Sequence, residues 1–192
     1  VKGLIKQRDN PDYPLQYADM VCKAMDSGIF DIVAHPDIFM QYRDSLSSEE
    51  SRKQFDANAV TASKQICAKA KEIGIPVELN LSAIDNGRVM SDGKYPYPHP
   101  MFWEEAARSG VQVLYGVDAH DPRQFDAMGW NRKVADQIVD PRRLNIVSPN
   151  YNPVEARKNN LTLQEKYANG QKFATTYETN LVTQLMFGML SK

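Results

Sequence analysis

The sequence predicts an α/β fold in which parallel strands alternate with helices. Short apolar runs of strand type alternate with longer stretches whose apolar residues recur at helical spacing. Because each helical crossover must return the chain over the sheet, strands separated in this way pair in parallel. The expected strands are residues 29–34, 76–81 and 111–116, with a shorter one at 144–147.

The helices are predicted from periodicity and from the glycines that end them. Apolar residues recur at helical spacing in four stretches, and Gly28, Gly74 and Gly110 lie within three residues of the end of three of them, where a helix would stop. Residues 85–100, rich in Gly, Pro and Tyr, predict a loop. The expected helices cover residues 15–25, 48–73, 102–107 and 126–139.

Three or four strand–helix units cannot close a barrel by themselves, but they can form part of one. Residues 1–150 can therefore be the parallel-strand portion of an incomplete barrel, which is what the resemblance described below implies. Residues 151–192 are expected to be a helical extension, because Leu181, Leu185, Met186 and Leu190 have the spacing of an amphipathic helix. The expected role of this extension is packing.

Composition excludes several classes of protein. The chain has 192 residues, 42% of them hydrophobic, and a net charge of −1 from 23 basic and 24 acidic residues. This balance predicts neither a nucleic-acid partner nor an anionic membrane partner. The apolar runs are too short to span a bilayer, and the first ten residues lack the apolar core of a signal peptide. The two cysteines, Cys22 and Cys67, lie in helical stretches and are expected to be core thiols in a cytoplasmic protein.

Polar side chains gather at the ends of the predicted strands. His35 and Asp37 follow the first strand, Glu78 and Asn80 end the second, and Asp118 and His120 follow the third. In parallel α/β folds the loops at this edge converge on one crevice, which is where active sites form. No glycine-rich phosphate loop, Gly-x-Ser-x-Gly elbow or Cys-x-x-Cys pair occurs in the sequence.

Each of these groups has a second, purely structural interpretation. Asp118 and His120 are two residues apart, so they can face one cavity and bind a divalent metal through oxygen and nitrogen; alternatively, Asp118 caps a helix and His120 bonds a loop. Pro36 fixes the turn after the strand and so directs the His35 side chain into the space above the sheet. Alternatively, the His35 ring forms hydrogen bonds with backbone groups, and Asp37 caps a short helical turn. Glu78 requires a metal, a cation or several donors, and we expect it to hold other groups in place rather than to bind metal.

The remaining histidine and three arginines are less specific. His99 lies in a proline-rich loop and is expected to be a surface or helix-capping residue. Arg43, Arg88 and Arg123 lie on loops at the expected catalytic edge, where an arginine fork would match a phosphate group. For any single one of them a solvated surface role is the alternative, and Arg43 is the candidate for substrate binding.

In order and spacing, three segments resemble the later motifs of the PHP (polymerase and histidinol phosphatase) superfamily. These segments are Phe30–Asp37, Val77–Asn80 and Leu114–His120. They resemble the family's His-Pro-Asp, Glu-Leu/Ile-Asn and Gly-Ser-Asp-Ala-His motifs, with Val117 in place of the usual serine. Residues 97–102 also resemble the histidinol-phosphatase branch, and the resemblance spans about residues 12–140.

The resemblance implies a distorted (β/α)7 barrel, similar to a TIM barrel, that holds up to three divalent metal ions, often zinc, manganese or iron. It implies that His35, Asp118 and His120 are metal ligands, that Asp118 and His120 are also catalytic, and that Glu78 and Asn80 line the substrate pocket with Arg43. The implied reaction is hydrolysis of a small phosphorylated substrate, L-histidinol phosphate, to L-histidinol and phosphate.

The family's opening His-x-His motif, its bridging glutamate and its further upstream histidines have no counterpart here. We therefore expect a fragment of a longer enzyme, inactive alone, whose exposed strand edges are covered by the missing part of the barrel or by another copy of the chain. Two alternatives remain open: another PHP phosphoesterase acting on nucleotides, and a non-catalytic PHP-derived scaffold.

Overall fold

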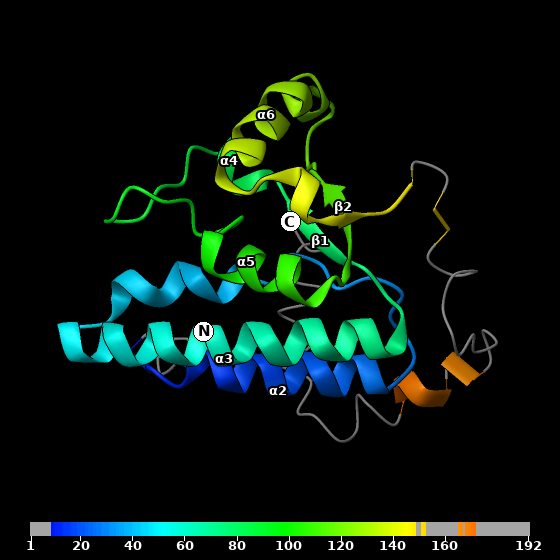
Figure 1. Ribbon diagram of the computed structural model, residues 1–192, viewed down its shortest axis with the longest axis horizontal. Helices are drawn as coiled ribbons and strands as arrows, with labels where there is room; N and C mark the ends of the chain where they lie inside the picture. The colour runs from blue at the N-terminus through cyan, green and yellow to red at the C-terminus, as the bar shows by residue number, and fades with distance from the viewer. Residues whose placement is uncertain (1–8, 149–150, 153–164, 167, 172–192) are drawn as a thin grey trace.

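A computed structural model describes residues 9–148, 151–152, 165–166 and 168–171 (Figure 1). Helices and strands alternate along most of this range, as the sequence predicts. In chain order the elements are α2 (Tyr13–Asp26), η1 (Ile38–Ser45), α3 (Glu49–Ile73), β1 (Val77–Asn80), α4 (Ser82–Asp85), α5 (Pro100–Ser109), β2 (Gln112–Gly116), η2 (Pro122–Phe125), α6 (Met128–Ile138), η3 (Pro141–Arg143) and β3 (Asn145–Ile146).

The strands form a three-stranded parallel sheet in the order β1-β2-β3. Val77 pairs with Val113, and Gln112 pairs with Asn145. The α/β class and the parallel pairing are thus confirmed. The sheet is not closed into a barrel in the part of the chain that the structure describes.

The prediction of a full strand over residues 29–34 is wrong. Only Val33 pairs there, through a parallel bridge to Val77 in which the N–H of Val33 donates to the carbonyl of Pro76. Residues 31–32 bend instead of extending. The carboxylate of Asp31 is bound by Lys166, whose Nζ lies 2.8 and 2.9 Å from its two oxygens. This segment is therefore held by a side-chain ion pair and not by a series of strand–strand backbone hydrogen bonds.

The longest helix, α3, begins and ends at residues that favour those positions. Ser48 accepts a hydrogen bond from the N–H of Ser51 at 3.1 Å, which satisfies one of the unpaired donors of the first turn. Gly74 ends the helix with a φ of 84°, a left-handed conformation that glycine adopts at little cost. The predicted helix over 48–73 is therefore confirmed almost to the residue.

Helices α2, α3 and α5 lie side by side beneath the strands in Figure 1, and α4 and α6 lie above them. Large side chains from the helices and from the strands are fully buried in one core. Phe55 of α3, Phe102 and Trp103 of α5, and Val77 and Val113 of the strands all belong to this core. Burial of these apolar surfaces is the main stabilising contribution to the fold.

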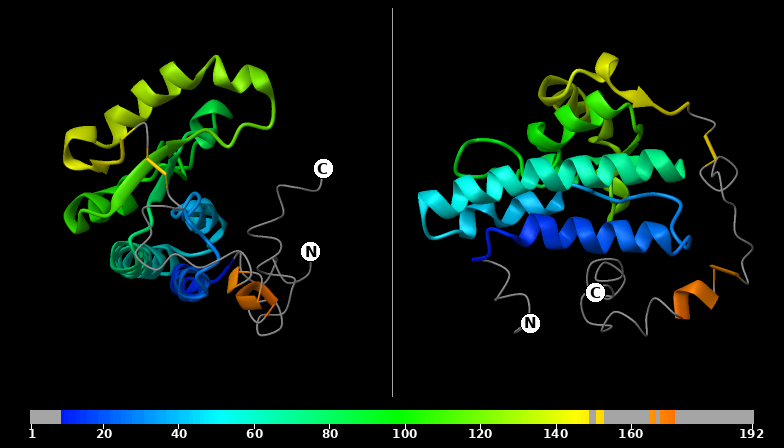
Figure 2. Two further views of the ribbon diagram at one scale, coloured as in Figure 1. Left: turned by 90° about the vertical axis from the view of Figure 1, so that its right-hand side faces the viewer. Right: turned by 60° about the horizontal axis from the view of Figure 1, so that its bottom comes forward.

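The two faces of the sheet differ in chemistry. The register places Leu79 beside Tyr115 on the face whose side chains meet helices, where the Tyr115 hydroxyl donates to Asp136 of α6 at 2.7 Å. Side chains alternate along a strand, so Glu78, Asn80 and Gly116 lie on the opposite face. In the left view of Figure 2, helices α3, α5 and α6 surround the sheet from one side.

The described part of the tail returns to the beginning of the fold. Besides the tie from Lys166 to Asp31, Asn169 donates from Nδ2 to the carbonyl of Ser27 at 2.7 Å. The predicted amphipathic helix near the carboxyl terminus, and most of the proposed 151–192 extension, lie outside the described residues. No helix within the described ranges has the length and apolarity needed to cross a membrane.

Candidate functional site

His35 lies just beyond the bridge residue Val33, at the carboxyl end of the first extended segment. Its side chain is buried, yet neither ring nitrogen has a hydrogen-bond partner among the described residues. Its backbone has a φ of 30°, which is uncommon for a residue with a side chain. A buried imidazole with two unpaired nitrogens is costly unless something binds it, so this side chain is a candidate ligand.

The carboxylate of Glu78 contacts the backbone of His35, the side chain of Asn80 and the backbone at Gly116. Its Oε2 accepts the backbone N–H of His35 at 2.9 Å and the side-chain N–H of Asn80 at 3.1 Å. On the other side it lies against Gly116, where an added Cβ would overlap Oε1 and Cδ and lie 2.7 Å from Cγ. Asn80 in turn accepts the N–H of Ser82 through Oδ1 at 2.8 Å. Glu78 and Asn80 thus hold backbone groups and each other, and substrate binding by either residue remains a prediction.

Asp37 is the most deeply buried carboxyl group of this region. Its Oδ2 accepts the N–H of His99 at 2.7 Å and the indole N–H of Trp103 at 2.9 Å, while Oδ1 has no partner among the described residues. Burial raises the pKa of this carboxyl to about 7. Asp37 stands at the start of η1, but its side chain caps nothing there, so that expectation is wrong.

His99 caps α5, as predicted, but it is buried instead of lying at the surface. Its Nδ1 accepts the N–H of Met101 at 3.3 Å, and its Nε2 has no partner in the described part of the chain. Burial lowers the pKa of this imidazole to about 4. The ring is therefore neutral at physiological pH, with Nδ1 as acceptor and Nε2 carrying the proton.

Asp118 and His120 follow β2, two and four residues beyond Gly116. Asp118 is half-buried and has a φ of 46°, and His120 is exposed. The ring Nδ1 of His120 lies 2.7 Å from the carbonyl of Asp118, a contact that, when Nδ1 carries the proton, leaves the lone pair of Nε2 for a metal. Asp118 does not cap the next helix, because Asp121 does so.

The loop that carries His120 is fastened to two other elements. Gln124 accepts the backbone N–H of His120 through Oε1 at 2.6 Å and donates from Nε2 to Asp85 of α4 at 2.8 Å. Asp85 also accepts from Asn131 of α6 at 3.0 Å. Sequence reasoning missed this amide–carboxylate bridge, because its members are far apart in the chain.

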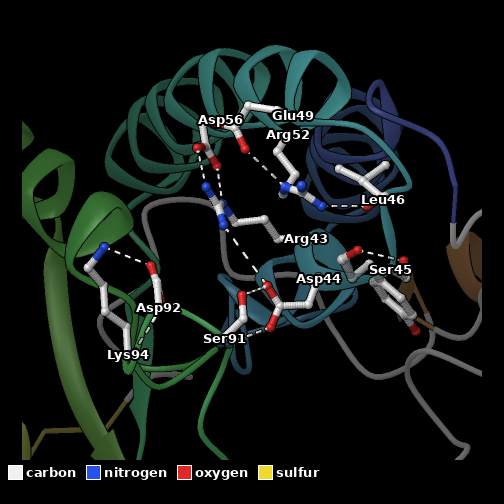
Figure 3. A network of polar contacts seen from close by, with 11 residues as sticks. Arg43, Asp44, Ser45, Leu46, Glu49, Arg52, Asp56, Ser91, Asp92 and Lys94 are labelled. Atoms are coloured by element: carbon white, nitrogen blue, oxygen red, sulfur yellow. Dashed lines mark hydrogen bonds and ion pairs between the residues drawn. The ribbon is translucent and has the colours of Figure 1, made fainter.

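The three arginines of the predicted edge differ in what already holds them. Arg43 donates through Nε and Nη2 to both oxygens of Asp56 of α3, at 2.7 and 2.9 Å (Figure 3). Arg123 pairs in the same bidentate way with Asp121. Substrate binding by Arg43 remains a prediction, and it would require this ion pair to open.

Arg88 is the arginine that contacts Tyr97, whose ring neighbours that of His35. It is exposed, and it donates to the hydroxyl of Tyr97 at 3.2 Å and to Gln41 at 2.9 Å. The ring of Tyr97 lies 6.5 Å from that of His35, centroid to centroid. Of the three arginines, Arg88 is thus linked to the candidate site through a neighbour of His35.

Single side chains at this edge of the sheet are suitable metal ligands, but they do not form a cluster. His35 offers unpaired ring nitrogens, and Asp118 and His120 are carboxylate and imidazole donors at the same edge of the sheet. However, within the described ranges no group of three or more His, Cys, Asp or Glu side chains is close enough to hold one ion. The described chain alone does not form a complete coordination sphere.

Comparison of the chain with models of protein families, with curated protein sequences and with solved structures gives no match.

Proposed function

We propose that this chain is part of a metal-dependent phosphomonoesterase of the PHP superfamily, most similar to histidinol phosphatases. In this proposal the three parallel strands belong to a distorted (β/α)7 barrel whose active site faces the carboxyl ends of the strands. The protein acts in the cytoplasm on a small phosphorylated substrate, and neither nucleic acid nor membrane is a partner.

One observation carries the proposal. Among the described residues, His35 and Asp118 are the only non-glycine residues with positive φ. They are also two of the metal ligands that the sequence resemblance implies, and each follows the end of an extended segment of the sheet. Such conformations cost on the order of 1–3 kcal/mol and cluster at functional sites.

Each residue has a role that follows from its surroundings. His35 and Asp118 would supply a nitrogen and an oxygen ligand, and His120 a second nitrogen beside Asp118. A bound divalent ion would supply Lewis-acid stabilisation of the phosphate oxygens and a nucleophilic water. Arg88 is better placed than Arg43 to pair with the phosphate, because Arg43 is already engaged with Asp56.

Metal binding tests the proposal on the 192-residue chain. Calorimetric titration with Mn²⁺ and Zn²⁺ should show weak binding, because the described ligands are incomplete. His35→Gln and Asp118→Asn should each weaken binding by about tenfold or more, while Asp126→Asn, which removes an exposed carboxylate elsewhere, should not. Binding that is identical in all four proteins would contradict the proposal.

Hydrolysis separates the substrate classes. We expect no phosphatase activity from the chain alone, and activity towards histidinol phosphate from a longer protein that contains it and completes the barrel. Preference for a nucleotide phosphomonoester would instead identify another phosphoesterase of this superfamily.

A second candidate is a non-catalytic scaffold derived from the same fold. It is favoured by the lack of any three-ligand cluster within the described residues. The absence of measurable metal in a gently purified longer protein, together with no binding by the chain, would support the scaffold over the enzyme.

A further inference from the structure

We infer that Glu78 and Gly116 form a positioning device that holds His35 in its left-handed conformation, with Glu78 binding neither substrate nor metal. The inference rests on the proposed function for its purpose, but its geometry can be tested separately. It differs from the substrate-binding role that the family resemblance implies for Glu78.

A hydrogen bond joins the side chain of Glu78 to the backbone of His35. Oε2 of Glu78 accepts that N–H at 2.9 Å, across the boundary between the first extended segment and β1. At the other side of the same residue, the carbonyl of His35 accepts the N–H of Ile38 at 3.0 Å. Both backbone polar groups of His35 are therefore fixed, which holds its φ of 30°.

The ring of His35, in contrast to its backbone, makes no hydrogen bond to the described residues. Neither Nδ1 nor Nε2 has a partner among the described residues, although the side chain is only 6% exposed. Its orientation therefore depends on the backbone conformation and on packing. Fixing the backbone presents both nitrogens without using either as an anchor, which suits a residue that must bind something else.

Because Gly116 has no side chain, it leaves the space that the Glu78 carboxylate occupies. A Cβ at residue 116 would overlap the end of the Glu78 side chain, and the backbone there does not need glycine for its φ. Replacing Gly116 by alanine would thus push a flexible carboxylate aside without straining the strand itself. Asn80 holds the same carboxylate at 3.1 Å, so the side chain is confined from two directions.

The test uses nuclear magnetic resonance of the full chain. Its three histidines give three ring systems in long-range ¹⁵N spectra. Glu78→Ala and Gly116→Ala should each move the His35 amide proton upfield and shift the His35 ring nitrogens, leaving those of His99 in place. Glu78→Gln keeps an acceptor oxygen and should preserve the wild-type His35 signals. Gly129→Ala, with nothing within 4 Å of the added Cβ, is the matched control.

Metal affinity gives the second readout. The dissociation constant for Mn²⁺ should rise about 10- to 100-fold in Glu78→Ala and Gly116→Ala, and stay near the wild-type value in Glu78→Gln and Gly129→Ala. If the wild-type chain binds neither Mn²⁺ nor Zn²⁺ and the longer protein contains no metal, the proposed function fails, while the His35 resonances still decide the positioning role. Unchanged His35 signals in folded Glu78→Ala would overturn the inference. So would equal losses of Mn²⁺ affinity in Glu78→Ala and Glu78→Gln, because they would make the charge of Glu78 the important property.

Discussion

Asp37 and His99 should give the stability of this protein two opposing dependences on pH. Burial raises the pKa of the Asp37 carboxyl to about 7 from its ordinary 3.8, and lowers that of the His99 imidazole to about 4 from 6.5. Both groups are neutral in the folded protein between about pH 4 and pH 7, whereas in the unfolded chain both are charged over much of that range.

The signs follow from which state holds the proton. Between pH 3.8 and about pH 7, Asp37 is protonated in the folded protein but ionised in the unfolded chain. The free energy of unfolding therefore decreases as the pH rises through this window. Between about pH 4 and pH 6.5, His99 is protonated in the unfolded chain but neutral in the folded protein. The free energy of unfolding therefore decreases as the pH falls through this window. At about 1.4 kcal/mol per pKa unit, the two contributions are about 4 and about 3 kcal/mol.

Single substitutions should separate the two slopes. Asp37→Asn keeps an acceptor for His99 and Trp103 and should leave only the pH dependence of His99, so its free energy of unfolding falls by about 3 kcal/mol from pH 7 to pH 4, whereas in the wild type the two contributions nearly cancel. His99→Asn keeps a good helix cap and should leave the Asp37 slope, a rise of about 4 kcal/mol over the same interval.

The assay is urea unfolding followed by tryptophan fluorescence at several pH values, in the presence of a chelator so that bound metal does not contribute. Asp126→Asn is the matched loss of an exposed carboxylate. The reasoning is refuted if Asp37→Asn has the same pH profile as wild type, or if the two variants change in the same direction.

Three further outcomes follow from particular contacts. Ser48→Ala should lower the free energy of unfolding by about 1 kcal/mol, measured in urea, because α3 loses its cap; no change would mean that water replaces the hydroxyl fully. Phe55→Ala should cost about 3–5 kcal/mol in the same assay, because its ring is fully buried; a cost below that of Ser48→Ala would contradict the core described for α3. Arg88→Ala should weaken binding of inorganic phosphate to the metal-loaded protein while leaving the melting temperature unchanged, whereas Arg43→Ala should lower the melting temperature and leave phosphate binding intact; the reverse result would favour Arg43 as the substrate residue.

Helix ends and parallel pairing could be predicted because their signals are local. Ser48 and Gly74 bound α3 in the sequence as they do in the structure, and the alternation of helical and apolar runs was enough to predict β1, β2 and β3. The shortening of the 29–34 strand could not be predicted, because it accompanies a tie between Asp31 and Lys166, which are distant in sequence.

The edge of the sheet at which the candidate residues lie could be predicted, but their contacts could not. That His35 and Asp118 lie at the carboxyl edge follows from strand order alone. That Glu78 accepts the His35 N–H, or that Asp37 and His99 are buried together, depends on how loops fold over the sheet. The glycine at 116 was a usable signal, since a glycine inside a strand often marks a close approach by another group.

The parallel sheet also has a consequence for the order in which the chain acquires its structure. Each strand pairs only after a complete helical crossover has been laid down, so every pairing closes a long loop before it gains hydrogen bonds. Helices such as α3 need no such closure and can form early. We therefore expect docking of β2 onto β1 to limit the refolding rate, with His35 and Glu78 meeting only when the first extended segment joins them.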